Sequence, residues 1–304
     1  MLTIMKQYKR VWGVGCLSIL LAASACSESN APMEDAAEQM TFSVLHPNQP
    51  KATRATDTAF ETNDQVGLLI TVEDTPLEVS GNYVNNATLT FNGSQWNPAK
   101  AIYWNEGTYD VFAYYPYTAS ISSVDDMPFS VALDQSTEGD ETTLSGYEAS
   151  DFLWANSQGV SAGNESVSLQ FKHRMSRLMI QLVKGADYEG NDLPENAEVY
   201  IHNTVPSATI DLSAGVVTRN TYGTKQTIRA KSLGNQRYTA ILVPQRLDNR
   251  QPLVEVIMNG VSYLYESKFN FKAGMQHNVQ LAISKDPEQI KIEIGGEIEN
   301  WNEE

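Results

Sequence analysis

The chain has 304 residues, a formal net charge of −16 and two cysteines, Cys16 and Cys26. Its length suits one large domain or two ordinary ones. The negative charge would repel a phosphate backbone, which excludes nucleic acid as a partner. Because both cysteines lie before residue 27, the rest of the chain can form no internal disulfide and has no thiol nucleophile. A hydrophobic core must therefore hold the fold together.

Residues 1–25 have the pattern of an export signal. Three basic residues precede an apolar run, Val11–Ala25, that is too short to span a bilayer core of ~30 Å. Ala23-Ser24-Ala25 and then Cys26 resemble the lipobox of bacterial lipoproteins, in which the cysteine is acylated and becomes the first residue. We therefore expect a lipid anchor at Cys26. The alternative is ordinary signal cleavage, with Cys26 incidental.

Residues 26–54 read as a polar N-terminal tether or pro-segment. One short stretch departs from this composition. In Thr41–Leu45, the side chains of Phe42 and Val44 would lie on one face of a strand.

From about residue 64 onward, apolar residues recur with a period of two and turn residues interrupt them, which predicts an all-β fold. Asn92-Gly93 and Asn259-Gly260 each separate two alternating runs and predict tight hairpins. Residues 175–182 fit a helix and a strand equally by spacing, and the neighbouring runs favour a strand. The other alternating runs are Val66–Ile70, Tyr109–Tyr115, Val167–Phe171, Tyr238–Val243, Val279–Ile283 and Ile290–Ile294.

The composition becomes looser at Asn156–Asn164, which we take as a domain boundary. Each half then holds enough short strands for a sandwich. The expected organisation is an N-terminal β-sandwich over residues 55–163 and a C-terminal β-sandwich over residues 164–304.

The sequence offers little catalytic or metal chemistry. The four histidines are His46, His173, His202 and His277, and none is three or four residues from another. We therefore expect no metal site, no cofactor and no enzymatic activity. Two distant carboxylates could still meet as the acid pair of a hydrolase, and Tyr114, Tyr115 and Tyr117 could stack on sugar rings.

The order of features along the chain resembles the fimbrillin family, the subunits of type V pili. The lipobox and a short strand come first, followed by motifs that each carry part of the resemblance: Thr53-Arg54-Ala55, Asn63–Gly67, Ile102–Trp104, Phe112–Tyr117, Leu133–Ser136, Asp151–Ala155, Phe171–His173, Ser176–Leu178, and the C-terminal Ile290–Ile294 with Ile298 and Trp301.

This resemblance implies two transthyretin-like β-sandwiches in tandem, exported as a lipoprotein to the outer membrane and cell surface. It also implies an arginine-specific protease that cuts between Arg54 and Ala55, which would release the strand containing Phe42 and Val44. A terminal strand of another fimbrial subunit would then fill the groove. The assembly strand would be the C-terminal segment, whose candidate anchors are Ile290, Ile292, Ile294, Ile298 and Trp301.

The leading hypothesis is thus a fimbrial subunit or adhesin that assembles by strand donation. The C-terminal strand could instead close the sandwich of its own subunit, because its alternation is the same in both cases. A monomeric surface lipoprotein that binds glycans, or a carboxylate-dependent hydrolase, is the alternative from another class.

Overall fold

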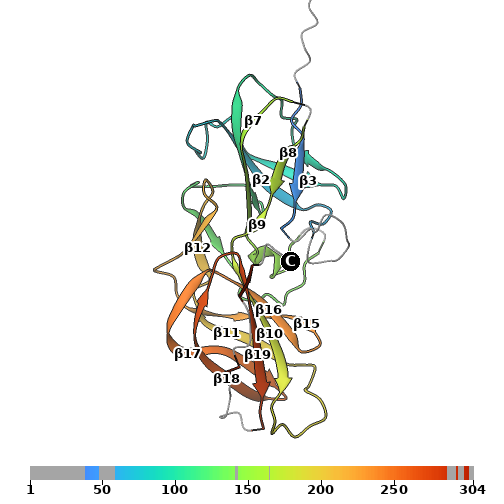
Figure 1. Cartoon of the computed structure of the whole chain (residues 1–304), viewed down its shortest axis with the longest axis vertical. Helices are drawn as coiled ribbons and strands as arrows, with labels where there is room; N and C mark the ends of the chain where they lie inside the picture. The colour runs from blue at the N-terminus through green and yellow to red at the C-terminus, as the bar shows by residue number, and fades with distance from the viewer. Residues whose placement is uncertain are drawn as a thin grey trace, which may run out of the picture. The chain divides into compact units, whose positions relative to one another are not determined.

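The computed structural model describes residues 38–47, 59–140, 143–163, 165–285, 292–293 and 298–300. These residues form β-strands and one short 3₁₀ turn, η1 (Glu148–Ser150), with no α-helix among them (Figure 1). Within this part of the chain, no helix is long and apolar enough to cross a membrane. The expectation of an all-β chain is confirmed.

The first core lies between a six-stranded sheet and a two-stranded one. The six-stranded sheet has the order β4-β3-β2-β5-β7-β9, and the pair is β1-β8. Their apolar side chains form one buried cluster. The strands are β1 (Phe42–Leu45), β2 (Gln65–Val72), β3 (Val84–Phe91), β4 (Trp96–Pro98), β5 (Thr108–Tyr115), β7 (Leu153–Ser161), β8 (Val167–Gln170) and β9 (Lys172–His173).

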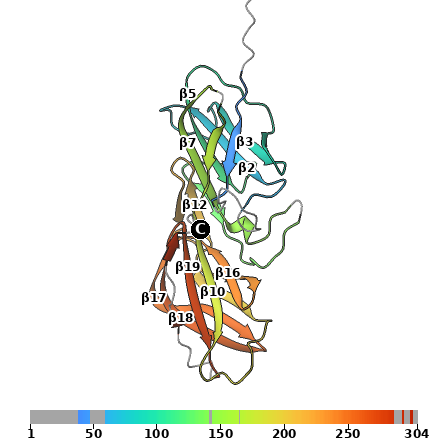
Figure 2. The ribbon, with the colours of Figure 1, turned by 45° about the vertical axis from the view of Figure 1, so that its right-hand side comes forward.

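The second core lies between a sheet ordered β15-β16-β10-β19-β20, with β21 also on β19, and a sheet ordered β14-β11-β17-β18. Figure 2 shows β10 between β16 and β19. A fifth sheet, β13-β12-β6, completes the fold of the described residues. The strands are β6 (Met127–Ser130), β10 (Ser176–Lys184), β11 (Glu198–Thr204), β12 (Ser207–Asp211), β13 (Val216–Arg219), β14 (Gln226–Arg229), β15 (Lys231–Gly234), β16 (Arg237–Leu242), β17 (Gln245–Met258), β18 (Val261–Phe271), β19 (Met275–Ile283), β20 (Ile292–Glu293) and β21 (Ile298–Asn300).

Both Asn-Gly hairpins form where the sequence predicts them. Asn259 and Gly260 have φ of 49° and 76° and join β17 to β18, the left-handed pair that a tight hairpin requires. Gly93, with φ of 91°, lies in the turn between β3 and β4. Of the ambiguous segment 175–182, residues 176–182 lie in strand β10, and Met175 directly precedes it.

Part of the predicted boundary at Asn156–Asn164 lies in a strand. Residues 156–161 are part of β7, which pairs with β5, so they are not a linker. Strands β8 and β9 pair with β1 and β7, and the pairing pattern changes after His173. Residues 37–304 form one compact unit, and a division into two sandwich domains stays a proposal.

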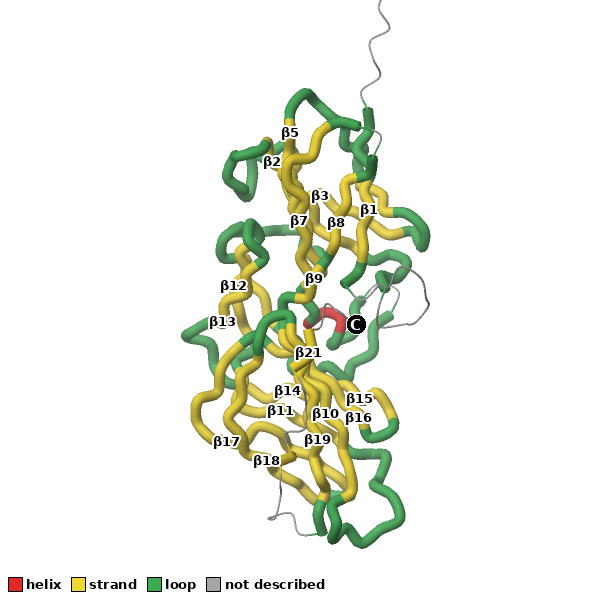
Figure 3. Tube along the Cα trace, viewed as in Figure 1, coloured by secondary structure: helices red, strands yellow, loops and turns green. Residues whose placement is uncertain are grey.

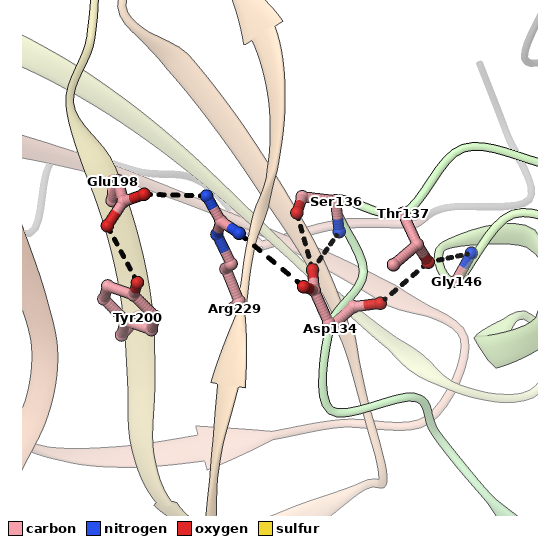
Figure 4. A network of polar contacts seen from close by, with 7 residues as sticks. All are labelled: Asp134, Ser136, Thr137, Gly146, Glu198, Tyr200 and Arg229. Atoms are coloured by element: carbon pink, nitrogen blue, oxygen red, sulfur yellow. Dashed lines mark hydrogen bonds and ion pairs between the residues drawn. The ribbon is translucent and has the colours of Figure 1, made fainter.

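Strand β6 and the nearby residues Asp134 and Gln135, all from the first half of the chain, contact strands of the second half. Strand β6 pairs with β12. The fully buried amide of Gln135 accepts a hydrogen bond from the backbone N–H of Ile241 (2.8 Å) and donates one to its carbonyl oxygen (2.7 Å). Beside it, Arg229 bridges Asp134 (3.6 Å) and Glu198 (2.7 Å), as Figure 4 shows. These contacts connect the two halves into a continuous structure.

The described C-terminal strands belong to the sheet of their own chain. Strand β20 pairs antiparallel with β19, with Ile292 opposite Leu281. Strand β21 pairs with the other end of β19, with Ile298 opposite His277. The edge of β19 is therefore occupied in cis.

His277 should make the fold sensitive to acid. It is 4% exposed, and its Nε2 accepts a hydrogen bond from the backbone N–H of Lys272 (3.2 Å). Burial lowers its pKa from 6.5 to about 4. The unfolded chain therefore binds this proton at higher pH than the folded chain, so stability should fall as pH decreases from about 6.5 to 4, by about 2–3 kcal/mol in total. Urea unfolding at pH 7 and pH 4 measures this loss. His277→Gln keeps the acceptor without the titration and should show a smaller loss, and an unchanged pH dependence would contradict the assignment.

Candidate functional site

Strand β1 and the residues just before it lie in a groove between strand β8 on one side and residues 102–104 on the other. We call this groove the seat of β1. On one side β1 lies beside β8 (Figure 3). The two strands are parallel, with Phe42 paired with Val167 and Val44 with Leu169. The N–H of Val167 donates to the carbonyl oxygen of Thr41 (2.8 Å). The strand is therefore held by a regular ladder on this side.

The residues just before β1 are held on the other side by the segment 102–104. The N–H of Met40 donates to the carbonyl oxygen of Ile102 (2.8 Å), and the N–H of Trp104 donates to that of Glu38 (2.7 Å). Loss of residues 38–45 would therefore leave unpaired backbone groups on two separate segments. Such unpaired edges readily accept another strand.

The side chains of this segment alternate between core and solvent. Met40, Phe42 and Val44 are 1%, 8% and 8% exposed, whereas Thr41, Ser43 and Leu45 face outward. The three buried side chains pack in the cluster that also holds Trp104, Leu169 and Phe171. Their burial corresponds to about 5–9 kcal/mol of hydrophobic stabilisation. Removing β1 would expose a continuous apolar floor.

A groove of about 500 Å³ runs along β1. Its apolar lining includes Phe60, which meets the ring of Trp96 edge-on at 5.0 Å, and its rim is polar, with Thr41, Ser94 and Asn97. The wall of the seat is thus partly open before any change in the chain.

An imidazole pair closes the far end of the seat. The ring of His46 packs edge-on against Phe60 (5.0 Å) and His173 (5.9 Å), and Nδ1 of His173 lies 3.0 Å from Asp151.

Sequence reasoning identified Phe42 and Val44 but missed Met40, His46 and Phe60. Met40 continues the same alternation by two residues and could have been found. The partners of His46 and Phe60 come from distant segments, and no local pattern indicates them.

The structure tests only part of the predicted site. Phe42 and Val44 lie together in β1, as expected. Ile292 and Ile298 lie in strands that pair with β19, not near β1. Cys26, Arg54, Ala55, Ile290, Ile294 and Trp301 fall outside the described residues.

An acidic cleft of about 850 Å³ lies near the end of this seat. It is lined by Asp64, Glu148 and Asp151, with the hydroxyl of Tyr115 donating to Asp64 (3.3 Å). Burial raises the pKa of Asp64, and burial beside Asp64 raises that of Tyr115. Of the three tyrosines considered for sugar stacking, Tyr114 and Tyr115 are 0% and 7% exposed and offer no open ring face, whereas Tyr117 is half-buried and lines the cleft. Within the described ranges, no group of three His, Cys, Asp or Glu side chains could hold a metal ion.

Residues Gly159–Gly163 have the G-x-S-x-G spacing of a hydrolase nucleophile elbow, which requires a turn from a strand into a helix. Here Ser161 is the exposed last residue of β7, and the described residues that follow form no helix. The motif therefore lacks the context that makes its serine a nucleophile.

Comparison with known proteins places the chain in a family. The family described as fimbrillin-like matches residues 53–301. The chain belongs to the fimbrillin-like family. This family is structural and non-enzymatic, which confirms the expectation that the chain is not an enzyme and removes the hydrolase alternative.

Among its relatives is Fim1C of Bacteroides ovatus, a protein described as a presumed fimbrium tip subunit. It is 30% identical over 216 residues, which are 63% of this chain and 39% of Fim1C. The chain thus spans less than half the length of that relative. Two solved structures, described as cell adhesion proteins from Bacteroides uniformis and Bacteroides ovatus, both match with a TM-score of 0.64 at 19% and 18% identity. They cover 86% and 87% of this chain, and 98% and 97% of their own chains. At this identity they show a shared fold.

Proposed function

We propose that this fimbrillin-like chain is a subunit or adhesin of a cell-surface fimbria that receives a strand from a neighbouring subunit in the seat of β1. The observation that carries the proposal is the seat itself. A short strand near the N-terminus fills an apolar channel with Met40, Phe42 and Val44, and polar tether sequence follows it. Cleavage after Arg54 would separate this strand from the rest of the fold. A donated strand would restore both the ladder and the alternating side chains.

The same proposal includes a tandem pair of transthyretin-like sandwiches and an outer-membrane lipoprotein precursor. The lipid at Cys26 would hold the uncut chain at the membrane, since several acyl chains anchor a protein far more firmly than one. Cleavage by an arginine-specific protease would then remove the anchor together with β1. One cut would thus release the subunit and open its acceptor groove.

The C-terminal strands favour a terminal place in the fimbria. Strands β20 and β21 pair with β19 of their own chain, so the chain in this state accepts a strand but donates none. Similarity to the presumed tip subunit Fim1C supports the same position.

Cys26→Ser tests the anchor. The substitution should prevent acylation, because the thiol sulfur is the acceptor of the lipid. The unacylated protein should then be retained before the outer membrane or be mislocalised. Membrane fractionation with metabolic labelling by a fatty acid measures this, and Ser24→Ala is the control for a change in the same segment. Unaltered labelling and fractionation of Cys26→Ser would rule out the anchor.

Deletion of residues 286–304 tests the role of the C-terminal strands. If they complete the sheet of their own chain, the deletion exposes the edge of β19 and should yield a destabilised, protease-sensitive protein. Thermal unfolding and limited proteolysis distinguish a segment that completes the sheet of its own chain from one that is donated to another subunit. A stable, folded monomer that no longer supports assembly would instead show that the segment acts in trans.

A further inference from the structure

Strand β18 is a long sheet edge with an unpaired side. It has 11 residues and pairs with β17 on one side, while no described strand pairs with its other side. The comparable edge strands β4, β13 and β15 have only 3, 4 and 4 residues, and β20 and β21 cover the edge of β19. A long unpaired edge is a template for pairing with another chain.

The side chains of β18 keep a regular alternation. Tyr263, Tyr265 and Phe271 are buried in the second core, whereas Leu264 and Glu266 are exposed on the outer face. The register of β18 against β17 shifts on both sides of Ser267, and the extra residues of these bulges lie on β17, so the backbone of β18 itself is continuous. A second strand added to this edge would pair with that continuous backbone. Its own residues must alternate with the same phase.

The charges of the outer face are self-complementary. Glu266 and Lys268 flank Ser267, and both are exposed. If two copies of β18 pair antiparallel around a two-fold axis at Ser267, each Glu266 lies opposite Lys268 of the other copy. Opposite charges at directly facing positions stabilise an antiparallel pair. The same register places inward Tyr265 opposite inward Phe269, so the buried faces also match.

We propose that β18 is a homodimerisation edge, through which two copies of this chain form a continuous antiparallel sheet centred on Ser267. A lysine on an edge strand usually discourages pairing. Here Glu266 of the second copy would offset the charge of Lys268. The ion pair between Arg250 and Glu266 (3.4 Å) does not prevent this, because it is solvent-exposed and such pairs contribute little. A two-fold contact is closed, so it yields a dimer and not a fibre.

Charge exchange at these two positions tests the proposal. The full chain, purified in density-matched detergent, is examined by sedimentation equilibrium up to about 100 μM. The wild type should dimerise. Lys268→Glu places two glutamates opposite each other at both positions and should weaken the dimer at least about tenfold. Adding Glu266→Lys to that variant restores opposite charges and should restore the affinity.

Lys100→Glu is the matched control, because it makes the same charge change at an exposed residue outside β18. Far-UV circular dichroism confirms that each variant is folded. A wild type that stays monomeric would overturn the proposal, as would a dimer insensitive to Lys268→Glu or a double variant that does not recover. Neither Arg54 nor the seat of β1 takes part, so the result is independent of strand donation.

Discussion

Arg54→Ala should leave a full-length chain that does not enter heat-stable, high-mass assemblies. The proposed protease requires an arginine before the cut, so the substitution keeps residues 38–47 attached and β1 in its seat. A filled seat has no unpaired backbone groups to accept a donated strand. Electrophoresis of unheated and heated cell-surface extracts separates assembled from unassembled subunits.

Two further variants sharpen this test. Arg54→Lys keeps the positive charge and should behave like Arg54→Ala, because the cut depends on arginine and not on charge. Lys51→Ala removes a nearby basic residue and should assemble normally. If Arg54→Ala still forms heat-resistant assemblies of high mass, the processing hypothesis is wrong for this chain.

Phe42→Ala combined with Val44→Ala should destabilise the uncut chain by about 4–6 kcal/mol. Both side chains are 8% exposed and pack into the first core, so their truncation leaves a cavity under β1. Urea unfolding of the Arg54→Ala background, in which no strand is lost by cleavage, measures the difference directly.

Ser43→Ala is the control for this pair, because Ser43 lies in the same strand with its side chain exposed. Its effect should stay within about 0.5 kcal/mol. A loss below about 1 kcal/mol for the double variant would show that β1 adds little to the stability of the fold. That result would contradict the proposal that the seat of β1 binds a donated strand.

The strands that the sequence predicts well are those with one buried face. Val279–Ile283 alternates because one face of its strand meets a core, and it forms a strand as expected. Tyr109–Tyr115 also forms a strand, but both of its faces are buried from Val111 to Tyr115, because each face meets a different core. Strand β7 shows why a paired strand can resemble a linker in the sequence. Only its first three residues are buried, and the remainder pairs with β5 through the backbone while its side chains stay largely exposed. Backbone pairing leaves no trace in side-chain composition, so Asn156–Ser161 resembles a linker.

The candidate site likewise combines residues that the sequence predicts with residues that it does not. Phe42 and Val44 could be predicted, because a pair of apolar residues two apart stands out in a polar segment. Their parallel partner β8 could not, since more than a hundred residues separate the two strands. The C-terminal isoleucines have the same period whether they pair in cis or in trans, so only the structure places Ile292 and Ile298 beside β19.

The N-terminal residue of the subunit in assembled fimbriae shows whether β1 is removed before assembly. Intact mass and N-terminal sequencing of protein from heat-stable cell-surface assemblies provide it. We expect a chain that begins at Ala55 and lacks residues 38–47. Assemblies built from chains that begin at acylated Cys26 and retain β1 would contradict it.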